Sequence, residues 1–179
     1  MKILAFAASS STKSINKKLV AYAGKLFVEQ HNTAKVEIID INDYEMPLFS
    51  TDREDELGHP QQAIDFIDKI KGSDALIISF AEHNGSYTAA YKNLFDWASR
   101  IDVKVFQNKP SLFLSTSTGQ GGAGSVLKSA ETSAPFFGAD LKVTLSIPSF
   151  EDDFDRTNNQ LTNAELKQKL NDALFKLRM

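Results

Sequence analysis

The sequence contains no cysteine among its 179 residues. This absence excludes disulfide bonds, thiol catalysis and metal sites built on thiolates. It fits a reducing compartment such as the cytoplasm. The chain also carries little excess charge, with a formal net charge of -3 at pH 7. The sequence therefore predicts no basic surface for nucleic acid, and we expect no nucleic-acid partner.

Long hydrophobic runs are missing as well. The apolar run at residues 2–8 is short and passes directly into three serines, which favours a buried strand over a signal peptide. No segment is long enough to span a membrane, so we expect a cytoplasmic protein with no membrane partner. His31, His59 and His83 lie in contexts that suggest no shared site, and no metal is predicted.

Short apolar runs alternate with helical patterns along the whole chain. The predicted strands cover residues 2–8, 35–41, 74–80, 111–115 and 141–147, and the predicted helices cover about 15–30, 60–72, 87–98, 123–137 and 162–177. Pro60 suits the first turn of a helix, and Gly72 suits a helix end. Thr162 and Glu165 have the spacing of a capping box that opens the last helix.

These strands are apolar on both faces, which requires a parallel sheet covered by helices on both sides. Five strand–helix units are too few for an eight-fold barrel, so we predict an open, doubly wound α/β sheet. No linker, repeat or low-complexity tract divides the chain, and we expect a single domain over residues 1–179. The irregular stretches 42–59 and 148–161 are either functional loops or surface excursions.

The loop after the first strand, residues 8–16, is rich in hydroxyl groups and opens a helix. Free N–H groups and the helix dipole favour an anion there. The alternative is that Ser14 or its neighbours simply cap the helix. The loop contains no glycine, which excludes the dinucleotide and P-loop motifs at this position. A phosphomonoester suits it better than a pyrophosphate pressed against the main chain.

Two further loops follow buried strands. Residues 81–88 are polar and could hydrogen-bond a heterocycle, and Ser86 could cap the next helix. Residues 119–124 hold four glycines in six positions, which lets the backbone approach a flat ligand closely. A mobile surface loop is the alternative. Glu82 and His83 lack both a G-x-S-x-G elbow and a placed partner, so hydrolysis is not predicted.

In order and position, these three loops resemble the NAD(P)H-dependent FMN reductase family, which includes quinone, chromate and azo-dye reductases. The family's first loop reads G-S-x-R-x-x-S-x-N followed by a leucine, and its second signature reads P-E-Y-N-x-S-x-P-G-x-L-K-N-x-x-D-W. The matching residues are Ser9, Ser14, Asn16 and Leu19 in the first, and Glu82, Asn84, Ser86, Lys92, Asn93, Asp96 and Trp97 in the second. The third loop resembles the family's Ser/Thr/Gly-rich segment, and Met46-Pro47-Leu48-Phe49 resembles an element near its flavin pocket.

The chain departs from the family pattern at several positions. Ala8 and Ser11 replace the glycine and the arginine of the first loop. The lost arginine would have paired with a phosphate, so binding would be weaker or Lys13 would supply the charge. His83, Thr88 and Ala89 replace a tyrosine and a proline–glycine pair, which bears on the choice of substrate.

The resemblance implies a flavodoxin-like, three-layer fold with a five-stranded parallel sheet of order 2-1-3-4-5 and helices on both faces. It implies an enzyme that binds FMN, takes hydride from NAD(P)H and passes it to a quinone, a free flavin or a similar small oxidant. The implied FMN contacts are Ser9, Ser11, Ser14, Ile15 and Asn16, then Glu82, His83, Asn84, Gly85 and Ser86, and finally Ser117, Thr118, Gly119, Gly121 and Gly122. No residue is assigned as catalytic.

The resemblance also implies a homodimer or homotetramer, with the helix carrying Lys92 to Trp97 near the interface. Tyr91, Phe95 and Trp97 could serve that interface, and a core position explains them equally well. Two other functions stay open. One is a flavodoxin-type FMN electron carrier without nicotinamide reductase activity, although the chain lacks a T-x-T-G-x-T loop and a strongly acidic face. The other is a binding module without flavin.

Overall fold

The computed structural model describes residues 1–177 and is built around a five-stranded parallel sheet. Its strands are β1 (Lys2–Ala8), β2 (Lys35–Ile39), β3 (Ala75–Phe80), β6 (Pro110–Thr116) and β7 (Asp140–Ile147). They lie in the order β2-β1-β3-β6-β7, and every neighbouring pair is parallel. Counted along the chain, this is the predicted order 2-1-3-4-5, so the flavodoxin-like α/β fold is confirmed.

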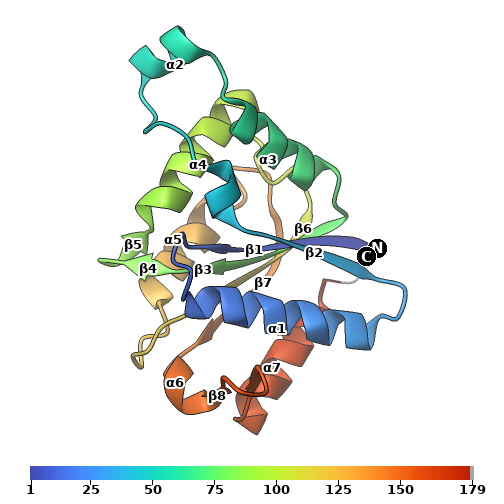
Figure 1. Ribbon diagram of the computed structural model, residues 1–179. Coiled ribbons are helices and arrows are strands. Elements are labelled where there is room, and N and C mark those ends of the chain that lie inside the picture. The colour runs from blue at the N-terminus through green and yellow to red at the C-terminus, as the bar shows by residue number, and fades with distance from the viewer. Residues whose placement is uncertain (178–179) are drawn as a thin grey trace.

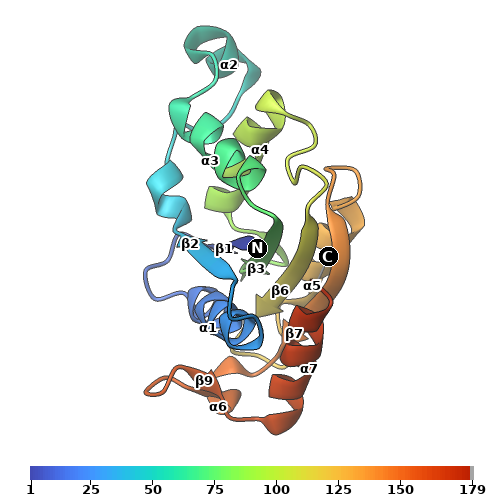
Figure 2. The same ribbon diagram turned by 90° about the vertical axis from the view of Figure 1, so that its right-hand side faces the viewer.

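Helices cover both faces of the sheet (Figures 1 and 2). On one face α1 (Ile15–Gln30) and α7 (Ala164–Phe175) pack over a core that includes Ile3, Leu112 and Phe150. On the other face α3 (Gln61–Lys71), α4 (Ala89–Ile101) and α5 (Gly124–Ser133) pack over a core rich in aromatic rings. Strands β1, β3 and β6 are nearly wholly buried because they are covered on both sides.

The two irregular stretches contain short elements that the sequence did not predict. The first holds a 3₁₀ helix, η1 (Ile41–Tyr44), and α2 (Thr51–Leu57), which buries no residue and projects at the top of Figure 1. The second holds α6 (Phe150–Asp153) and a small hairpin of β8 (Phe154–Asp155) and β9 (Gln160–Leu161). Such short pieces are set by local capping and turns rather than by a hydrophobic period.

Several predicted boundaries need correction. Tyr87 belongs to a hairpin of β4 (Glu82–His83) and β5 (Ser86–Tyr87), not to the following helix, and Thr88 rather than Ser86 caps α4. Asn84 and Gly85 both have positive φ, which builds the tight turn of this hairpin. The last helix is capped by Asn163, whose side chain accepts two N–H groups, and not by Thr162.

Two predicted elements are shorter than expected. Helix α5 ends at Ser133 instead of residue 137, because Pro135 brings no N–H to continue the helical ladder. Strand β2 ends at Ile39 because the side chain of Asp40 caps η1 by accepting the N–H of Asn42. Each end is therefore set by a single residue, Pro135 for α5 and Asp40 for β2.

Candidate functional site

The carboxyl ends of β1, β3 and β6 lie side by side at one edge of the sheet. The strand order reverses between β1 and β3, which is where an open α/β sheet forms a ligand crevice. The three loops that leave these strands are tied to one another. Thr88 donates its hydroxyl to the carbonyl of Ala8 at 3.0 Å, and the side-chain amide of Asn16 donates to the carbonyl of Thr116 at 3.2 Å. The loops thus form one assembly.

The first loop presents a series of three hydroxyl groups that leads into α1. Ser9 Oγ accepts the N–H of Ser11, Ser11 Oγ accepts the N–H of Lys13, and Ser14 Oγ accepts the N–H of Lys17, each at 3.3 Å. Each hydroxyl acts as an acceptor in these bonds and keeps its own proton to donate. Ser9 and Ser14 are buried and Ser11 is exposed. None of the three donates to another group within residues 1–177, so three donors remain for a ligand.

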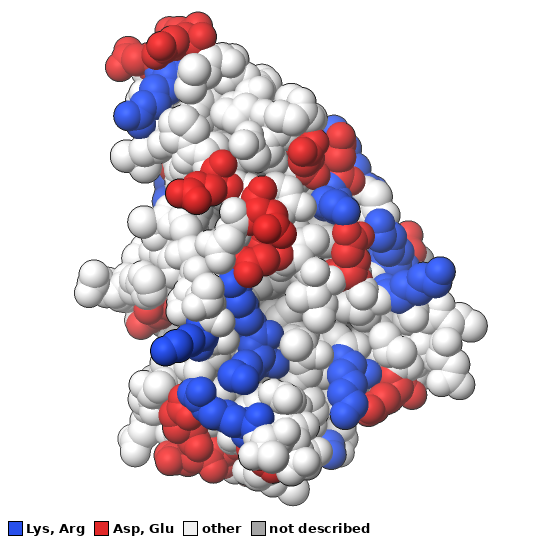
Figure 3. Space-filling model, viewed as in Figure 1, with Lys and Arg blue, Asp and Glu red and all other residues white. Residues whose placement is uncertain are grey.

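Backbone groups add to these donors at the start of α1. Within residues 1–177 the N–H groups of Ile15 and Asn16 donate to no acceptor, as expected for a first helical turn. Lysine and arginine side chains gather over this end of α1 in Figure 3, whereas acidic side chains gather over α2. The helix start is thus suited to an anion.

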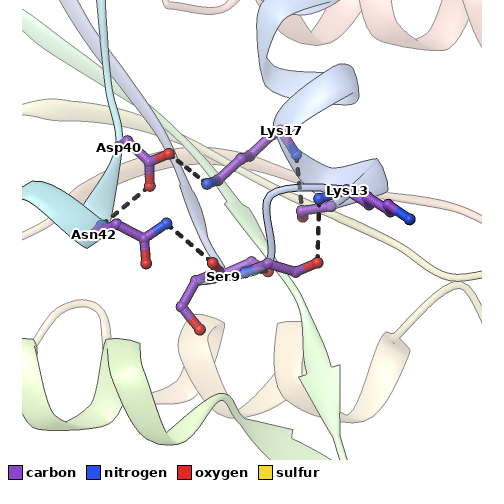
Figure 4. Close-up of polar contacts among 8 residues, drawn as sticks. Ser9, Lys13, Lys17, Asp40 and Asn42 are labelled. Atoms are coloured by element: carbon purple, nitrogen blue, oxygen red, sulfur yellow. Dashed lines mark hydrogen bonds and ion pairs between the residues drawn. The ribbon is translucent and has the colours of Figure 1, made fainter.

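The first loop is braced from the side of β2. Asn42 donates its side-chain amide to the carbonyl of Ser10 at 3.0 Å, and Lys17 forms an ion pair with Asp40 (Figure 4). Burial on its own would raise the pKa of Asp40, but the hydrogen bonds from Lys17 and Asn42 outweigh it and hold that pKa below its usual value. Lys17 is therefore engaged with a carboxylate, and Lys13 extends away from Ser9 in Figure 4.

Asn16 has a mainly internal role. Its Oδ1 accepts the hydroxyl of Ser79 at 2.7 Å and the N–H of Thr116 at 3.2 Å, and its amide donates to the carbonyl of Thr116. The side chain is buried and joins the start of α1 to the ends of β3 and β6. If a phosphate binds here, we expect it to meet the backbone N–H of Asn16 rather than the side chain.

The second loop is the β4–β5 hairpin, which projects from the sheet edge in Figure 1. His83, Asn84, Gly85 and Ser86 are all exposed, so their side chains and backbone are accessible to a ligand. Thr88 lies at the base of the hairpin, buried, where it caps α4 by accepting the N–H of Tyr91 and also holds Ala8. Thr88 is the residue that stands where the family signature has its proline.

Glu82 lies at the other base of the hairpin and reaches the third loop. Its carboxylate accepts the N–H of Val126 at 2.8 Å. Helix α5 has no side-chain cap of its own, since its N-cap residue is Ala123 in a left-handed conformation. Glu82 therefore supplies the negative charge that the start of α5 favours.

The third loop, residues 117–123, turns several of its carbonyls inward. Those of Ser117 and Gly119 accept the N–H groups of Phe150 and Ser149, and that of Gly122 accepts the hydroxyls of Ser115 and Ser146. The N–H groups of Thr118, Gly119 and Gly121 donate to no acceptor within the described part of the chain. The loop thus offers backbone donors to a ligand.

The glycines of this loop differ in what they require. Gly122 has a φ of 57°, and a Cβ there would lie 2.1 Å from Ser146 Oγ, so a side chain at this position would be strained and would force Ser146 to move. Gly119 and Gly121 have open space where a Cβ would stand. With Gly124 they also have the G-x-G-x-x-G spacing of dinucleotide sites. Glu82 already places a carboxylate at the start of α5, which disfavours a pyrophosphate there.

The K-N-x-x-D-W signature holds the segment after β2. Asn93 donates its amide to the carbonyls of Met46 and Pro47 at 3.1 and 3.2 Å, and its oxygen accepts the N–H of Phe49 at 2.8 Å. Trp97 is fully buried and donates its ring N–H to the carbonyl of Pro47 at 2.8 Å. The signature was recognised in the sequence, but this clamp was not predicted.

The architecture and the three loops define a flavodoxin-like protein with free hydrogen-bond donors at one edge of its sheet. Comparison with known proteins gives the particular family: residues 1–149 match the family described as NADPH-dependent FMN reductase, and the chain belongs to it. One relative is an NADPH:quinone oxidoreductase of Arabidopsis thaliana, which is 33% identical over 68% of this chain and 61% of its own length. Another is a probable NADPH:quinone oxidoreductase 1 of Oryza sativa, which is 28% identical over 99% of this chain and 90% of its own length. Among solved structures, the flavoenzyme FerB, an NAD(P)H:(acceptor) oxidoreductase of Paracoccus denitrificans, superposes with a TM-score of 0.77 at 20% identity, covering 98% of this chain and 94% of FerB.

The matched segment spans 61% of the Arabidopsis relative and 45% of a further relative, an NAD(P)H-dependent FMN reductase of Pseudomonas aeruginosa. In residues 1–177 no helix is long and apolar enough to cross a membrane, and no cluster of His, Asp and Glu side chains could hold a metal ion.

Proposed function

We propose that this chain binds FMN at the edge formed by the three loops and uses it to pass hydride from NADPH or NADH to a quinone or a similar small oxidant. The observation that carries this proposal is the series of Ser9, Ser11 and Ser14 hydroxyls at the start of α1, each with a proton free to donate. A phosphate monoester accepts several hydrogen bonds at once and is stabilised by the helix dipole. Family membership and the names of the relatives support the same function.

Each loop has its own part in this proposal. The first loop would hold the FMN phosphate through the three hydroxyls and through the N–H groups of Ile15 and Asn16. The hairpin residues Glu82–Ser86 and the loop residues Ser117–Gly122 would hold the ring on either side. The side chain of Asn16 and the hydroxyl of Thr88 position the first loop relative to the other two.

FMN, when bound, supplies the two-electron redox chemistry between nicotinamide and oxidant. The chain contributes orientation and electrostatics. The free N–H groups of Thr118, Gly119 and Gly121 would stabilise negative charge on a ligand placed against that loop. The neighbouring Gly122 lets its own backbone lie close against Ser146 and Pro148, which fixes the shape of the loop.

The test is an absorbance spectrum of the purified protein after incubation with FMN and desalting, followed by anaerobic NADPH and, separately, NADH. Visible flavin absorbance that bleaches with a nicotinamide and returns with a quinone is the expected result. Retained flavin that neither nicotinamide bleaches would instead identify an electron carrier. A colourless protein would overturn the FMN proposal.

The homodimer or homotetramer, the single domain over residues 1–179 and the cytoplasmic location stay predictions. Tyr91, Phe95 and Trp97, which were candidates for a subunit interface, are buried within the chain itself. Light scattering at micromolar concentration tests the predicted oligomer, and a monomer would contradict it.

A further inference from the structure

A cavity of about 180 Å³ lies between α4, α5 and the sheet. Seven of its wall residues are aromatic. They come from strands β3, β5 and β6, from helix α4 and from two loops, and they are Phe80, Tyr87, Tyr91, Phe95, Phe106, Phe113 and Phe137. None of the residues proposed to hold FMN lines it. It is therefore a separate feature of the molecule, and its chemistry can be considered independently of the flavin.

The walls form a connected set of rings. Phe80 packs edge-on against Tyr91 and Phe113, with ring centroids 5.5 and 5.1 Å apart, and Phe95 packs edge-on against Phe137 at 4.7 Å. Contacts of this kind fix the rings, so the space between them is not readily closed by a rotamer change. A cavity of roughly 150 Å³ with apolar walls stays dry and accepts a molecule the size of benzene. The volume here matches one aromatic ring.

Polar groups in the wall can also bind an oxygen atom of a ligand. Tyr91 is only 3% exposed, yet its hydroxyl makes no hydrogen bond with any residue from 1 to 177. Burial raises the pKa of Tyr91 well above its usual value, and the neighbouring Tyr87 raises it further, so the phenol stays neutral and able to donate. The hydroxyl oxygen itself stays accessible, so it can donate to an oxygen atom of a ligand in the cavity.

Tyr87 provides a second donor. Its hydroxyl lies 3.5 Å from Ser133 Oγ, a long contact at the limit of a hydrogen bond. Ser133 already donates to the carbonyl of Ser129 at 3.1 Å, so the hydroxyl proton of Tyr87 is available for a better acceptor. The exposed Lys92 and the half-exposed Asp96 pair with each other at the cavity edge, and their charges cancel there. A neutral ligand thus fits better than an ion.

We propose that this cavity is a binding site for a neutral, one-ring aromatic compound that carries an oxygen substituent, of the phenol class. The ring occupies the space between Phe80, Phe95 and Phe113, and its oxygen accepts from Tyr91 and Tyr87. The site itself does not depend on FMN.

The test uses 4-fluorophenol as the probe and follows its fluorine NMR signal during titration with the full chain, both with and without FMN. We expect binding with a dissociation constant of about 0.1–1 mM for a ligand of eight non-hydrogen atoms. The value should be the same with and without FMN. No change in the signal at several times these concentrations would overturn the proposal.

Two variants locate the bound probe. Ala130 lines the cavity and is 3% exposed, so Ala130→Leu fills the space; it should abolish probe binding without lowering the melting temperature or FMN binding. Tyr91→Phe keeps the ring and removes the hydroxyl, and should weaken 4-fluorophenol about five-fold while leaving fluorobenzene unchanged. Binding that survives both changes places the probe elsewhere and overturns the assignment.

Light scattering completes the test. A dimer that Ala130→Leu dissociates would show that a second copy of the chain covers this cavity, and this result would also overturn the proposal.

Discussion

The carboxylate of Glu82 accepts the backbone N–H of Val126 at 2.8 Å and thereby joins the β4–β5 hairpin to the start of α5. These are the two loops that the proposed function places on either side of the flavin ring. Glu82 matches the family signature, and in this structure its carboxylate binds the backbone of a neighbouring loop. The distance between the two loops is therefore set by a charge-assisted hydrogen bond.

Removing this bond should weaken flavin binding without removing the phosphate site. We predict that Glu82→Ala raises the FMN dissociation constant about five-fold, the effect of one lost hydrogen bond of about 1 kcal/mol. Glu82→Gln keeps an oxygen acceptor and should stay within about two-fold of the parent. Quenching of flavin fluorescence measures both constants. An unchanged constant for Glu82→Ala would show that the two loops keep their places without this bond.

The second prediction concerns Gly122. Its positive φ and the 2.1 Å approach of a Cβ to Ser146 Oγ make Gly122→Ala destabilising by about 1–3 kcal/mol. For a chain of this size, that corresponds to a fall in melting temperature of about 2–10 °C. Gly121→Ala is the matched control, since Gly121 has open space and no positive φ, and it should leave the melting temperature nearly unchanged. Equal effects of the two substitutions would contradict the assignment of the close contact to Gly122.

Much of this architecture could be predicted from the sequence because it rests on burial. The central strands β1, β3 and β6 are mostly apolar and nearly wholly buried, and such runs indicate strands covered on both faces. The loops were also placed correctly after β1, β3 and β6. In contrast, the hairpin at 82–87 is too short to show a hydrophobic period, and its Asn84-Gly85 turn was read as part of a loop.

The internal role of Asn16 and the cap formed by Glu82 could not be predicted for a different reason. Both side chains act over long separations, reaching Thr116 and Val126. A motif gives the residue type and its position, but not whether the side chain faces a ligand or a neighbouring loop. The clamp from Asn93 to Met46 and Pro47 is a third case of this kind.

The third prediction tests that clamp. Asn93→Ala removes three hydrogen bonds to the segment 46–49 and should loosen it, so that limited proteolysis cuts there several times faster than in the parent. The exposed Asn32, whose side chain makes no hydrogen bond within residues 1–177, gives the control Asn32→Ala. Cleavage rates that match between parent and Asn93→Ala would mean that Trp97 alone holds the segment through Pro47.

The last prediction concerns Asp40, which pairs with Lys17 beside the proposed phosphate loop. Its pKa lies below the usual 3.8 because the hydrogen bonds from Lys17 and Asn42 outweigh the effect of burial. A carboxyl with a depressed folded-state pKa adds stability above its unfolded value, and this contribution is lost as pH falls through the folded value. The pair should therefore persist across pH 5 to 8 and fail only in acid below about pH 4.

Carbon NMR of the Asp40 carboxyl measures this pKa directly. Lys17→Met should raise it toward 3.8 or above, whereas Lys25→Met, which removes a lysine paired with Glu29, should not change it. If Lys17→Met leaves the pKa of Asp40 depressed, Asn42 alone is sufficient to hold the charge, and the ion pair does not brace the loop.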